Sequence, residues 1–314
     1  MSLTRREAFS KLFTGAALTI AGGAGLMTIT GTAHAEEVAR APKNAIGMLY
    51  DATRCIGCQS CVAACAQANN LAPDVRVDQL HYTAHELNSF TKNIIKLYKD
   101  ASASRYSYVK QQCMHCVDPA CVAGCSFFAL SKNESTGVVS WTPDKCVGCR
   151  YCEISCPYHV PKFQWEGYNP KIVKCELCKE RLAKGEQPAC TSVCPTHAVV
   201  FGTRDQLIAE GRKRVADAPG KYYQDRVYGE SDNGGTQVLY LSKANVSFEK
   251  LGLPEGSTES VPQKYLKWQK RLYSYLVLPI ALYAGVTGVI NKNWKEHQHH
   301  MEEEQKKTGL RPQL

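Results

Sequence analysis

The sequence lacks the motifs by which most enzymes bind phosphate or build a nucleophile. It has no glycine-rich phosphate loop, no G-x-S-x-G elbow and no dinucleotide-binding fingerprint. Charged residues are missing from two long stretches, 12–33 and 272–290, and cysteine is missing outside residues 55–194. The sequence therefore does not indicate phosphate, acyl-transfer or nicotinamide chemistry. The informative regions are the two uncharged stretches and the cysteine-rich segment between them.

The first uncharged stretch is typical of an export signal. Arg5 and Arg6 precede a weakly hydrophobic, glycine-rich segment that ends in Ala33-His34-Ala35. This pattern predicts a twin-arginine (Tat) signal peptide over residues 1–35, with a permanent anchor or a mitochondrial presequence as the alternatives. The Tat route carries folded proteins, so it suits a chain that acquires a metal cofactor on folding, before it crosses the membrane.

The second uncharged stretch is long enough to cross a bilayer. Residues 272–290 would form a helix of about 28 Å, close to the thickness of the hydrocarbon layer. We therefore predict a transmembrane helix over 272–290. If residues 36–271 lie outside the cytoplasm, residues 291–314 form a cytoplasmic tail. The alternative is an apolar helix packed in a soluble core, but Pro279, Gly285 and Gly288 are tolerated better in membrane helices.

The 16 cysteines form four groups of four, with none left over. Each group begins with C-x2-C and ends with C-x3-C. The groups are Cys55, Cys58, Cys61 and Cys65; Cys113, Cys116, Cys121 and Cys125; Cys146, Cys149, Cys152 and Cys156; and Cys175, Cys178, Cys190 and Cys194.

Three kinds of site compete for this pattern. Disulfides are common in exported proteins, but three cysteines within seven residues would close strained loops. Zinc accepts paired C-x2-C knuckles, yet a zinc site gives no reason for a third cysteine two residues later. The run from Cys146 to Pro157 matches the bacterial ferredoxin motif, in which three thiolates bind one [4Fe-4S] cluster and the fourth binds another. The four groups therefore predict four [4Fe-4S] clusters.

The cluster spacing predicts an α+β fold made of tandem, pseudo-symmetric ferredoxin-like modules over residues 36–205. Short strands are expected at 48–50, 106–109, 138–141 and 199–201, and short helices at 61–69 and 150–156. Thr203 and Gln206 form a capping box for an amphipathic helix towards Ala216. Residues 206–271 are expected to form an extension and a membrane-proximal linker, with a strand-like stretch at 236–241.

The net charge of +9 is largely offset by the predicted clusters. A [4Fe-4S] cluster with four thiolates carries about −2, so four of them add about −8. With the charge compensated, the basic composition no longer indicates nucleic-acid binding. The basic residues in or beside the cysteine groups are Lys110, Lys145, Arg150, Lys162, Lys171 and Lys174. His115 is expected near a cluster or on the surface rather than as a ligand, because the four-cysteine set is complete.

Closed four-thiolate clusters leave no open metal position for a substrate. The chemistry that remains is one-electron transfer between partners. The chain is thus expected to be a non-catalytic electron-transfer subunit.

Several segments resemble the four-cluster ferredoxin-like subunit of membrane-bound [NiFe] uptake hydrogenases of the hydrogenase-2 type. They are residues 47–51, 110–119, 149–152, 156–158, 174–178, 201–203 and 235–239. The resemblance extends to the signal and the terminal helix. The cysteine motifs alone are shared with iron-sulfur subunits of formate dehydrogenase and related molybdenum enzymes.

The resemblance implies that the first and fourth cysteine groups pair, as do the second and third. The implied ligand sets are Cys55, Cys58, Cys61 and Cys194; Cys65, Cys175, Cys178 and Cys190; Cys113, Cys116, Cys121 and Cys156; and Cys125, Cys146, Cys149 and Cys152. Ser126 and Ala66 depart from the family, where proline often follows the last cysteine of a group, and this puts the rigidity of those loops in doubt.

The resemblance also implies the partners. Electrons from H2 would pass from a [NiFe] hydrogenase, through its small subunit and these clusters, to an integral membrane subunit that reduces a quinone. The chain would lie on the periplasmic face of the bacterial inner membrane. The alternatives are a formate dehydrogenase-like iron-sulfur subunit and, in a different class, a soluble iron-sulfur enzyme with its own substrate site.

Overall fold

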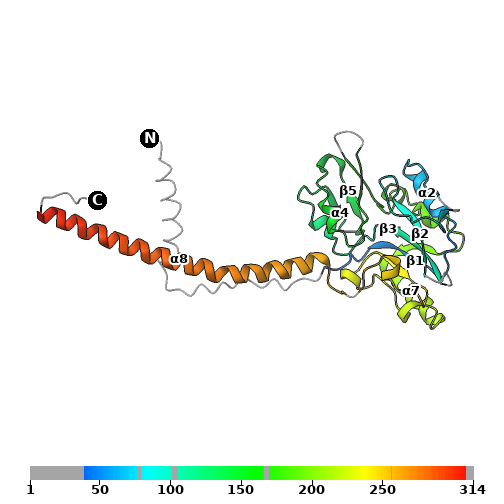
Figure 1. The fold of residues 1–314 in the computed structure, drawn as a ribbon. Helices are drawn as coiled ribbons and strands as arrows, with labels where there is room; N and C mark the ends of the chain where they lie inside the picture. The colour runs from blue at the N-terminus through cyan, green and yellow to red at the C-terminus, as the bar shows by residue number, and fades with distance from the viewer. Residues whose placement is uncertain (1–38, 76–78, 101–104, 166–169, 256, 309–314) are drawn as a thin grey trace. The chain divides into compact units, whose positions relative to one another are not determined.

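A three-stranded sheet joins segments from both ends of the cysteine-rich region (Figure 1). Strand β1 (Ile46–Asp51) pairs antiparallel with β8 (Val199–Thr203) and parallel with β9 (Val238–Leu241). Met48 and Tyr50 pack in one core cluster and Leu49 packs in another, so both faces of β1 are buried. A strand covered on both faces needs the continuous apolar run that residues 48–50 provide.

The computed structural model describes residues 39–75, 79–100, 105–165, 170–255 and 257–308. The described residues from 40 onwards form one unit by their contacts. The predicted Tat signal, residues 1–35, lies outside the described residues.

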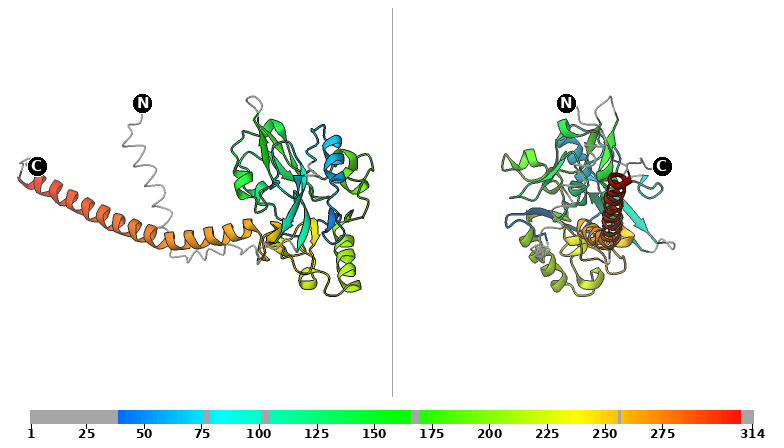
Figure 2. Two further views of the ribbon diagram at one scale, coloured as in Figure 1. Left: turned by 45° about the vertical axis from the view of Figure 1, so that its right-hand side comes forward. Right: turned by 90° about the vertical axis from the view of Figure 1, so that its left-hand side faces the viewer.

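Three antiparallel hairpins accompany the central sheet, and short helices follow the cysteine motifs. In Figures 1 and 2, α4 and β5 lie on one side of the β2–β3 pair and α2 on the other. The hairpins are β2 (Asn93–Lys99) with β3 (Tyr106–Gln112), β4 (Leu130–Lys132) with β5 (Val139–Trp141), and β6 (Lys162–Gln164) with β7 (Lys171–Val173). The short helices are α2 (Ser60–Ala68), α3 (Ala120–Ala123), α4 (Tyr151–Ser155), α5 (Lys179–Leu182) and α6 (Ala189–Ser192).

The local structure predicted from the sequence is confirmed at most positions. The four expected strands are β1, β3, β5 and β8, and the two expected helices are α2 and α4. Helix α7 (Arg204–Asp217) begins with the predicted capping box, in which Gln206 N–H donates to the Thr203 hydroxyl over 3.4 Å. The mixture of short strands and helices confirms the α+β class.

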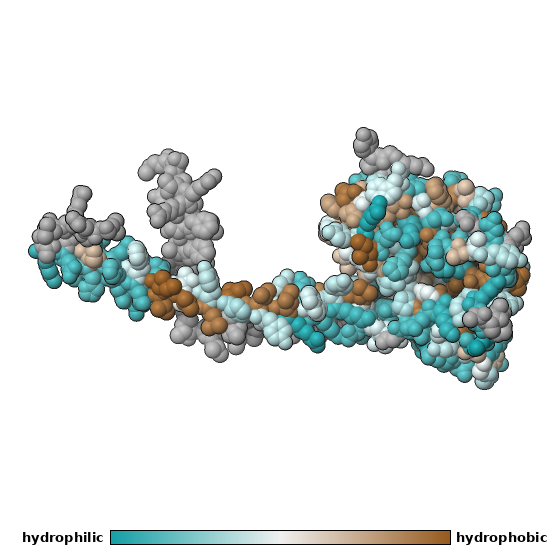
Figure 3. Space-filling view, in the orientation of Figure 1, coloured by the Kyte–Doolittle hydropathy of each residue, from teal (hydrophilic) through white to brown (hydrophobic). Residues whose placement is uncertain are grey.

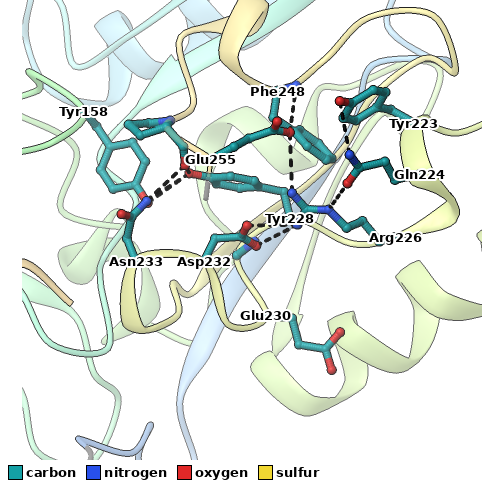
Figure 4. A network of polar contacts seen from close by, with 12 residues as sticks. Tyr158, Tyr223, Gln224, Arg226, Tyr228, Glu230, Asp232, Asn233, Phe248 and Glu255 are labelled. Carbon is teal, nitrogen blue, oxygen red and sulfur yellow. Dashed lines mark hydrogen bonds and ion pairs between the residues drawn. The ribbon is translucent and has the colours of Figure 1, made fainter. Parts of the chain in front are cut away.

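The segment after residue 217 packs into the body rather than only reaching away from it. Figure 4 shows Arg226 between Asp232 and Glu255, with N–O distances of 2.9 and 3.4 Å. Asn233 donates to the Tyr158 hydroxyl over 3.4 Å, and Tyr158 follows the last cysteine of the third group by two residues. Together with β9, these contacts make residues 218–255 part of the support for the cysteine loops.

A buried ion pair ties α7 to β1, four residues before the first cysteine. Arg214 Nη1 lies 3.2 Å from Asp51 Oδ2, and the two side chains are 6% and 0% exposed. Asp51 also accepts hydrogen bonds from Thr53 and Tyr222. Arg54, at 43% exposure, is the second cation near this carboxylate.

Arg214→Ala should destabilise the protein by about 2 to 3 kcal/mol, because the buried carboxylate of Asp51 then keeps the solvent-exposed Arg54 as its cationic partner. The midpoint of an anaerobic thermal scan should fall by roughly 5–10 °C. Arg212→Ala, which removes an exposed arginine paired with Glu230, is the control and should change stability by less than about 0.5 kcal/mol. Equal shifts for the two variants would show that the pair is not stabilising.

Helix α8 (Val261–Thr308) contains the second uncharged stretch. It is the one helix in the described part of the chain that is long and apolar enough to cross a membrane, and none of its most apolar window is buried. Figure 3 shows apolar residues along the middle of α8 and polar residues towards its ends. Val277, Ile280 and Leu282 are each more than 60% exposed. An apolar surface of this extent needs a cover, and a lipid bilayer fits its length.

Candidate iron-sulfur sites

All sixteen cysteines are free thiols, and the structure brings them together in four groups of four. We number these groups as sites 1 to 4. In each site, three thiols come from one sequence motif and the fourth from another. Site 1 is Cys55, Cys58, Cys61 and Cys194; site 2 is Cys65, Cys175, Cys178 and Cys190; site 3 is Cys113, Cys116, Cys121 and Cys156; and site 4 is Cys125, Cys146, Cys149 and Cys152.

Shared cavities and mutual electrostatic effects define the four sites. The thiols of sites 1 and 4 each line one cavity. In sites 2 and 3 the thiols lie close enough to repel one another as thiolates. Burial raises the pKa of Cys65, and the thiolates of Cys175, Cys190 and Cys178 raise it further. These groups of neighbouring thiols have the members that the resemblance named as ligand sets, and their role as cluster ligands stays a prediction.

The same backbone turn opens all four motifs. The residue two positions after the first cysteine has a positive φ in each: Gly57 (74°), His115 (46°), Gly148 (72°) and Leu177 (52°). This turn points amide N–H groups towards sulfur, as when Leu177 N–H approaches Cys175 Sγ with an N–S distance of 3.4 Å. A β-carbon at Gly57 would lie 2.4 Å from the Tyr108 ring. The C-x2-C spacing shared by the four motifs therefore corresponds to one shared backbone turn.

A second turn follows the last cysteine in three of the motifs. Phe128 N–H donates to the Cys125 carbonyl, His159 N–H to that of Cys156, and His197 N–H to that of Cys194, over 3.1 to 3.3 Å. Proline follows Cys156 and Cys194, whereas Ser126 follows Cys125. The loop at Ser126 therefore forms the same turn without proline.

After Cys65 the chain continues as helix α2 instead, up to Ala68. There Asn69 Nδ2 donates to the Cys65 carbonyl over 2.8 Å and lies 3.7 Å from the Cys65 sulfur. The helix and its cap, rather than a proline, hold the loop that follows Ala66.

Helix pairing explains why each site takes one thiol from a second motif. Helix α2 packs against α6, and α3 packs against α4. Each of these four helices carries at least one cysteine. Packing two of them together therefore places the last cysteine of one motif beside the first three of another. This arrangement pairs the first motif with the fourth and the second motif with the third.

The four sites are neighbours in the order 1 to 4, and we call this series the row. Thiols of successive sites lie close enough to act on one another electrostatically: Cys61 and Cys190 for sites 1 and 2, Cys113 and Cys175 for sites 2 and 3, and Cys121 and Cys152 for sites 3 and 4. The two exposed cysteines, Cys58 and Cys149, belong to the terminal sites. The row is thus buried in the middle and open at both ends.

The chemistry of the thiols fits clusters. Within the described ranges, no three His, Cys, Asp or Glu side chains converge on a position for a single metal ion. A [4Fe-4S] cluster is larger than one ion, so its ligands surround a cavity, as at sites 1 and 4. Burial raises the pKa of Cys190 to about 11 and that of Cys152 to about 12. Buried thiols of this kind ionise when metal charge compensates them.

Two of the six basic residues beside the motifs are buried. Lys110 is 1% exposed and Lys174 is 2% exposed. Lys145, Arg150 and Lys171 are exposed, and Lys162 is partly buried and pairs with Glu153 over 2.9 Å. Of these six residues, Lys110 and Lys174 are therefore the ones placed to compensate cluster charge inside the protein.

His115 is fully buried beside the thiols of its motif, as one of the two expectations had it. The alternative, a surface position, is wrong. Its Nδ1 accepts a hydrogen bond from Val139 N–H over 3.0 Å. Burial, followed by the charge of Lys174, holds the pKa of His115 well below its usual value, so the ring is neutral. His115 Nε2 has no hydrogen-bond partner among the described residues. A buried N–H beside site 3 is a donor that a cluster sulfur could satisfy.

Comparison with known proteins agrees with this geometry. Residues 104–204 match the family described as "4Fe-4S dicluster domain". The chain is 40% identical over 299 residues to the hydrogenase-2 operon protein HybA of Escherichia coli O157:H7, which covers 85% of this chain and 90% of HybA. The chain belongs to the HybA family. It is also 27% identical over 285 residues to the formate dehydrogenase iron-sulfur subunit of Haemophilus influenzae, with 86% and 90% coverage.

Membership of the HybA family confirms the fold class, a ferredoxin-type [4Fe-4S] protein with a C-terminal apolar helix. It also confirms the expected role as an iron-sulfur electron-transfer subunit without a catalytic site of its own.

Proposed function

We propose that this HybA-family protein relays electrons through four [4Fe-4S] clusters between the small subunit of a [NiFe] uptake hydrogenase and an integral membrane subunit that reduces quinone. The observation that carries the proposal is the row of four thiol sites with an exposed cysteine at each end. The likeness to the hydrogenase-2 operon protein HybA supports a hydrogenase as the electron donor.

In this proposal the sixteen cysteines of sites 1 to 4 are the iron ligands. When bound, each cluster accepts and releases one electron. The surrounding chain holds the thiols, directs N–H groups at the sulfurs and keeps water from the inner sites. Because thiols of adjacent sites are neighbours, an electron would not need to leave the protein between sites 1 and 4.

The position of α8 supports an orientation for the row. Helix α8 contacts α3, which carries Cys121 of site 3. A groove there is lined by Ala123 of α3 and Ser155 of α4 on one side and by Val261 and Tyr265 of α8 on the other. This supports a proposal in which site 4 faces the membrane subunit and site 1 faces the hydrogenase.

Apolar residues around the two exposed cysteines support partner docking at both ends. Val147, Tyr151 and Ile154 are 56 to 76% exposed beside site 4, and Ile56 is 58% exposed beside site 1. Exposed apolar residues grouped around a redox centre are typical of interfaces with protein partners.

The proposal uses the predicted domains: 1–35 a Tat signal, 36–205 the double ferredoxin-like domain, 206–271 an extension and membrane-proximal linker, of which 218–255 pack against the body, 272–290 the transmembrane part of α8 and 291–314 a cytoplasmic tail. The protein would lie on the periplasmic face of the bacterial inner membrane.

Anaerobic affinity purification of the full chain from solubilised membranes tests the partners. We expect nickel and two hydrogenase subunits to co-purify in amounts comparable with the chain. Co-purification of molybdenum and molybdopterin instead would assign the chain to a formate dehydrogenase-like complex, which the 27% identity to such a subunit makes the second candidate.

A further inference from the structure

Lys110 is a buried cation whose charged neighbours are thiols. It lies on β3, is 1% exposed, and donates to the Gln112 side-chain oxygen. Gln112 in turn donates to Met48 Sδ over 3.4 Å, and Met48 Sδ lies 3.8 Å from Cys190 Sγ of site 2. The thiols that act electrostatically on the Lys110 ammonium group are Cys190, Cys175 and Cys65 of site 2 and Cys61 of site 1. A buried ammonium group needs a negative partner, and site 2 provides it.

Lys174 has the same relation to site 3. It is 2% exposed, and its ammonium group donates to the carbonyl oxygens of Val139 and Cys175. Its charge opposes the rise that burial causes in the pKa of Cys113 and Cys121. Both are site 3 thiols.

Among the residues that the structure describes, site 4 has no comparable buried cation. After burial, the groups that act most strongly on Cys152 are the three other thiols of its own site. The basic residues near its motif, Lys145 and Arg150, are exposed. Their charges act through water and are screened, whereas the charges of Lys110 and Lys174 act through protein.

We propose that Lys110 and Lys174 are fixed positive charges that raise the reduction potentials of the two inner clusters, at sites 2 and 3, above that of site 4. This inference rests on the proposed function. Reduction adds one electron and takes a cluster with its four thiolates from about −2 to about −3, with no proton taken up. A nearby positive charge favours the more negative state. Electrons would then reside on the inner clusters rather than at site 4.

The test is a redox titration of the full chain, purified anaerobically, with the clusters followed by electron paramagnetic resonance. The variants are Lys110→Met and Lys174→Met, which keep side-chain length and remove charge. Each should lower one of the two highest midpoints by at least about tenfold in the equilibrium constant for reduction, which is 59 mV for one electron. Lys171→Met, which removes an exposed lysine three residues from Lys174, is the matched control and should leave every midpoint within a third of that shift.

The outcomes separate the inference from the proposed function. A wild-type chain without about sixteen irons would overturn the proposed function. Full iron content with unchanged midpoints in Lys110→Met and Lys174→Met would overturn only the inference. If Lys110→Met loses iron, Lys110→Gln, which keeps a polar group for Gln112, is titrated instead. Loss of a cluster in that variant as well would assign Lys110 to cluster assembly and would also overturn the inference.

Discussion

Replacing Cys149 by serine is expected to abolish electron transfer from hydrogen to quinone. Cys149 is an exposed thiol of site 4, the end of the row that we assign to the membrane partner. Loss of a ligand should remove or convert that cluster, and the effect should exceed the roughly 10–100-fold losses typical of changes around a ligand shell. Hydrogen oxidation with an artificial dye by the isolated catalytic pair should be unchanged, because that reaction does not use this chain.

The control for this variant is Ser131→Ala, an exposed change on β4 that touches no thiol site. It should retain both activities. Assays of hydrogen-dependent quinone reduction in membranes, together with iron content, compare the variants. If Cys149→Ser reduced the dye-linked and quinone-linked activities equally, the relay role would be contradicted.

Deleting residues 272–314 should release the protein from membranes. The deletion removes the exposed apolar residues of α8, including Val277, Ile280 and Val289. Transfer of each of these side chains from water into the bilayer stabilises membrane binding by roughly 1.5–3 kcal/mol. Without them, the chain should be found entirely in the soluble fraction. Fractionation of cells that express the deletion measures this.

A shorter deletion, residues 291–314, is the matched control. It removes the polar end of α8, with His297, His299 and His300, and leaves the apolar stretch, so the chain should stay with the membrane. Retention of the longer deletion after a high-salt wash would mean that a partner, rather than α8, provides the anchor.

The parts of the structure that were predictable are those set by local sequence. The run at residues 48–50 predicts β1, and Thr203 with Gln206 predicts the start of α7, because a buried strand and a capping box depend on adjacent residues. Strand β9 was foreseen only as a strand-like stretch within an extension. Its parallel pairing with β1 joins residues about 190 positions apart, and no local signal encodes that pairing.

The candidate sites were predictable in composition but not in detail. Cysteine spacing indicated cluster ligands, but six basic residues beside the motifs looked alike, and only tertiary packing buries Lys110 and Lys174. The left-handed turn was visible at Gly57 and Gly148 but hidden at His115 and Leu177, where a bulkier residue adopts the same conformation. Aligning the four motifs with one another is the signal that could have located it.

Iron and acid-labile sulfide in anaerobically purified full-length protein test the central claim most directly. We expect about sixteen irons and about sixteen sulfides per chain, no zinc, and no free thiol accessible to alkylation until the clusters are removed. Disulfide-linked cysteines, or zinc in place of iron and sulfide, would contradict it.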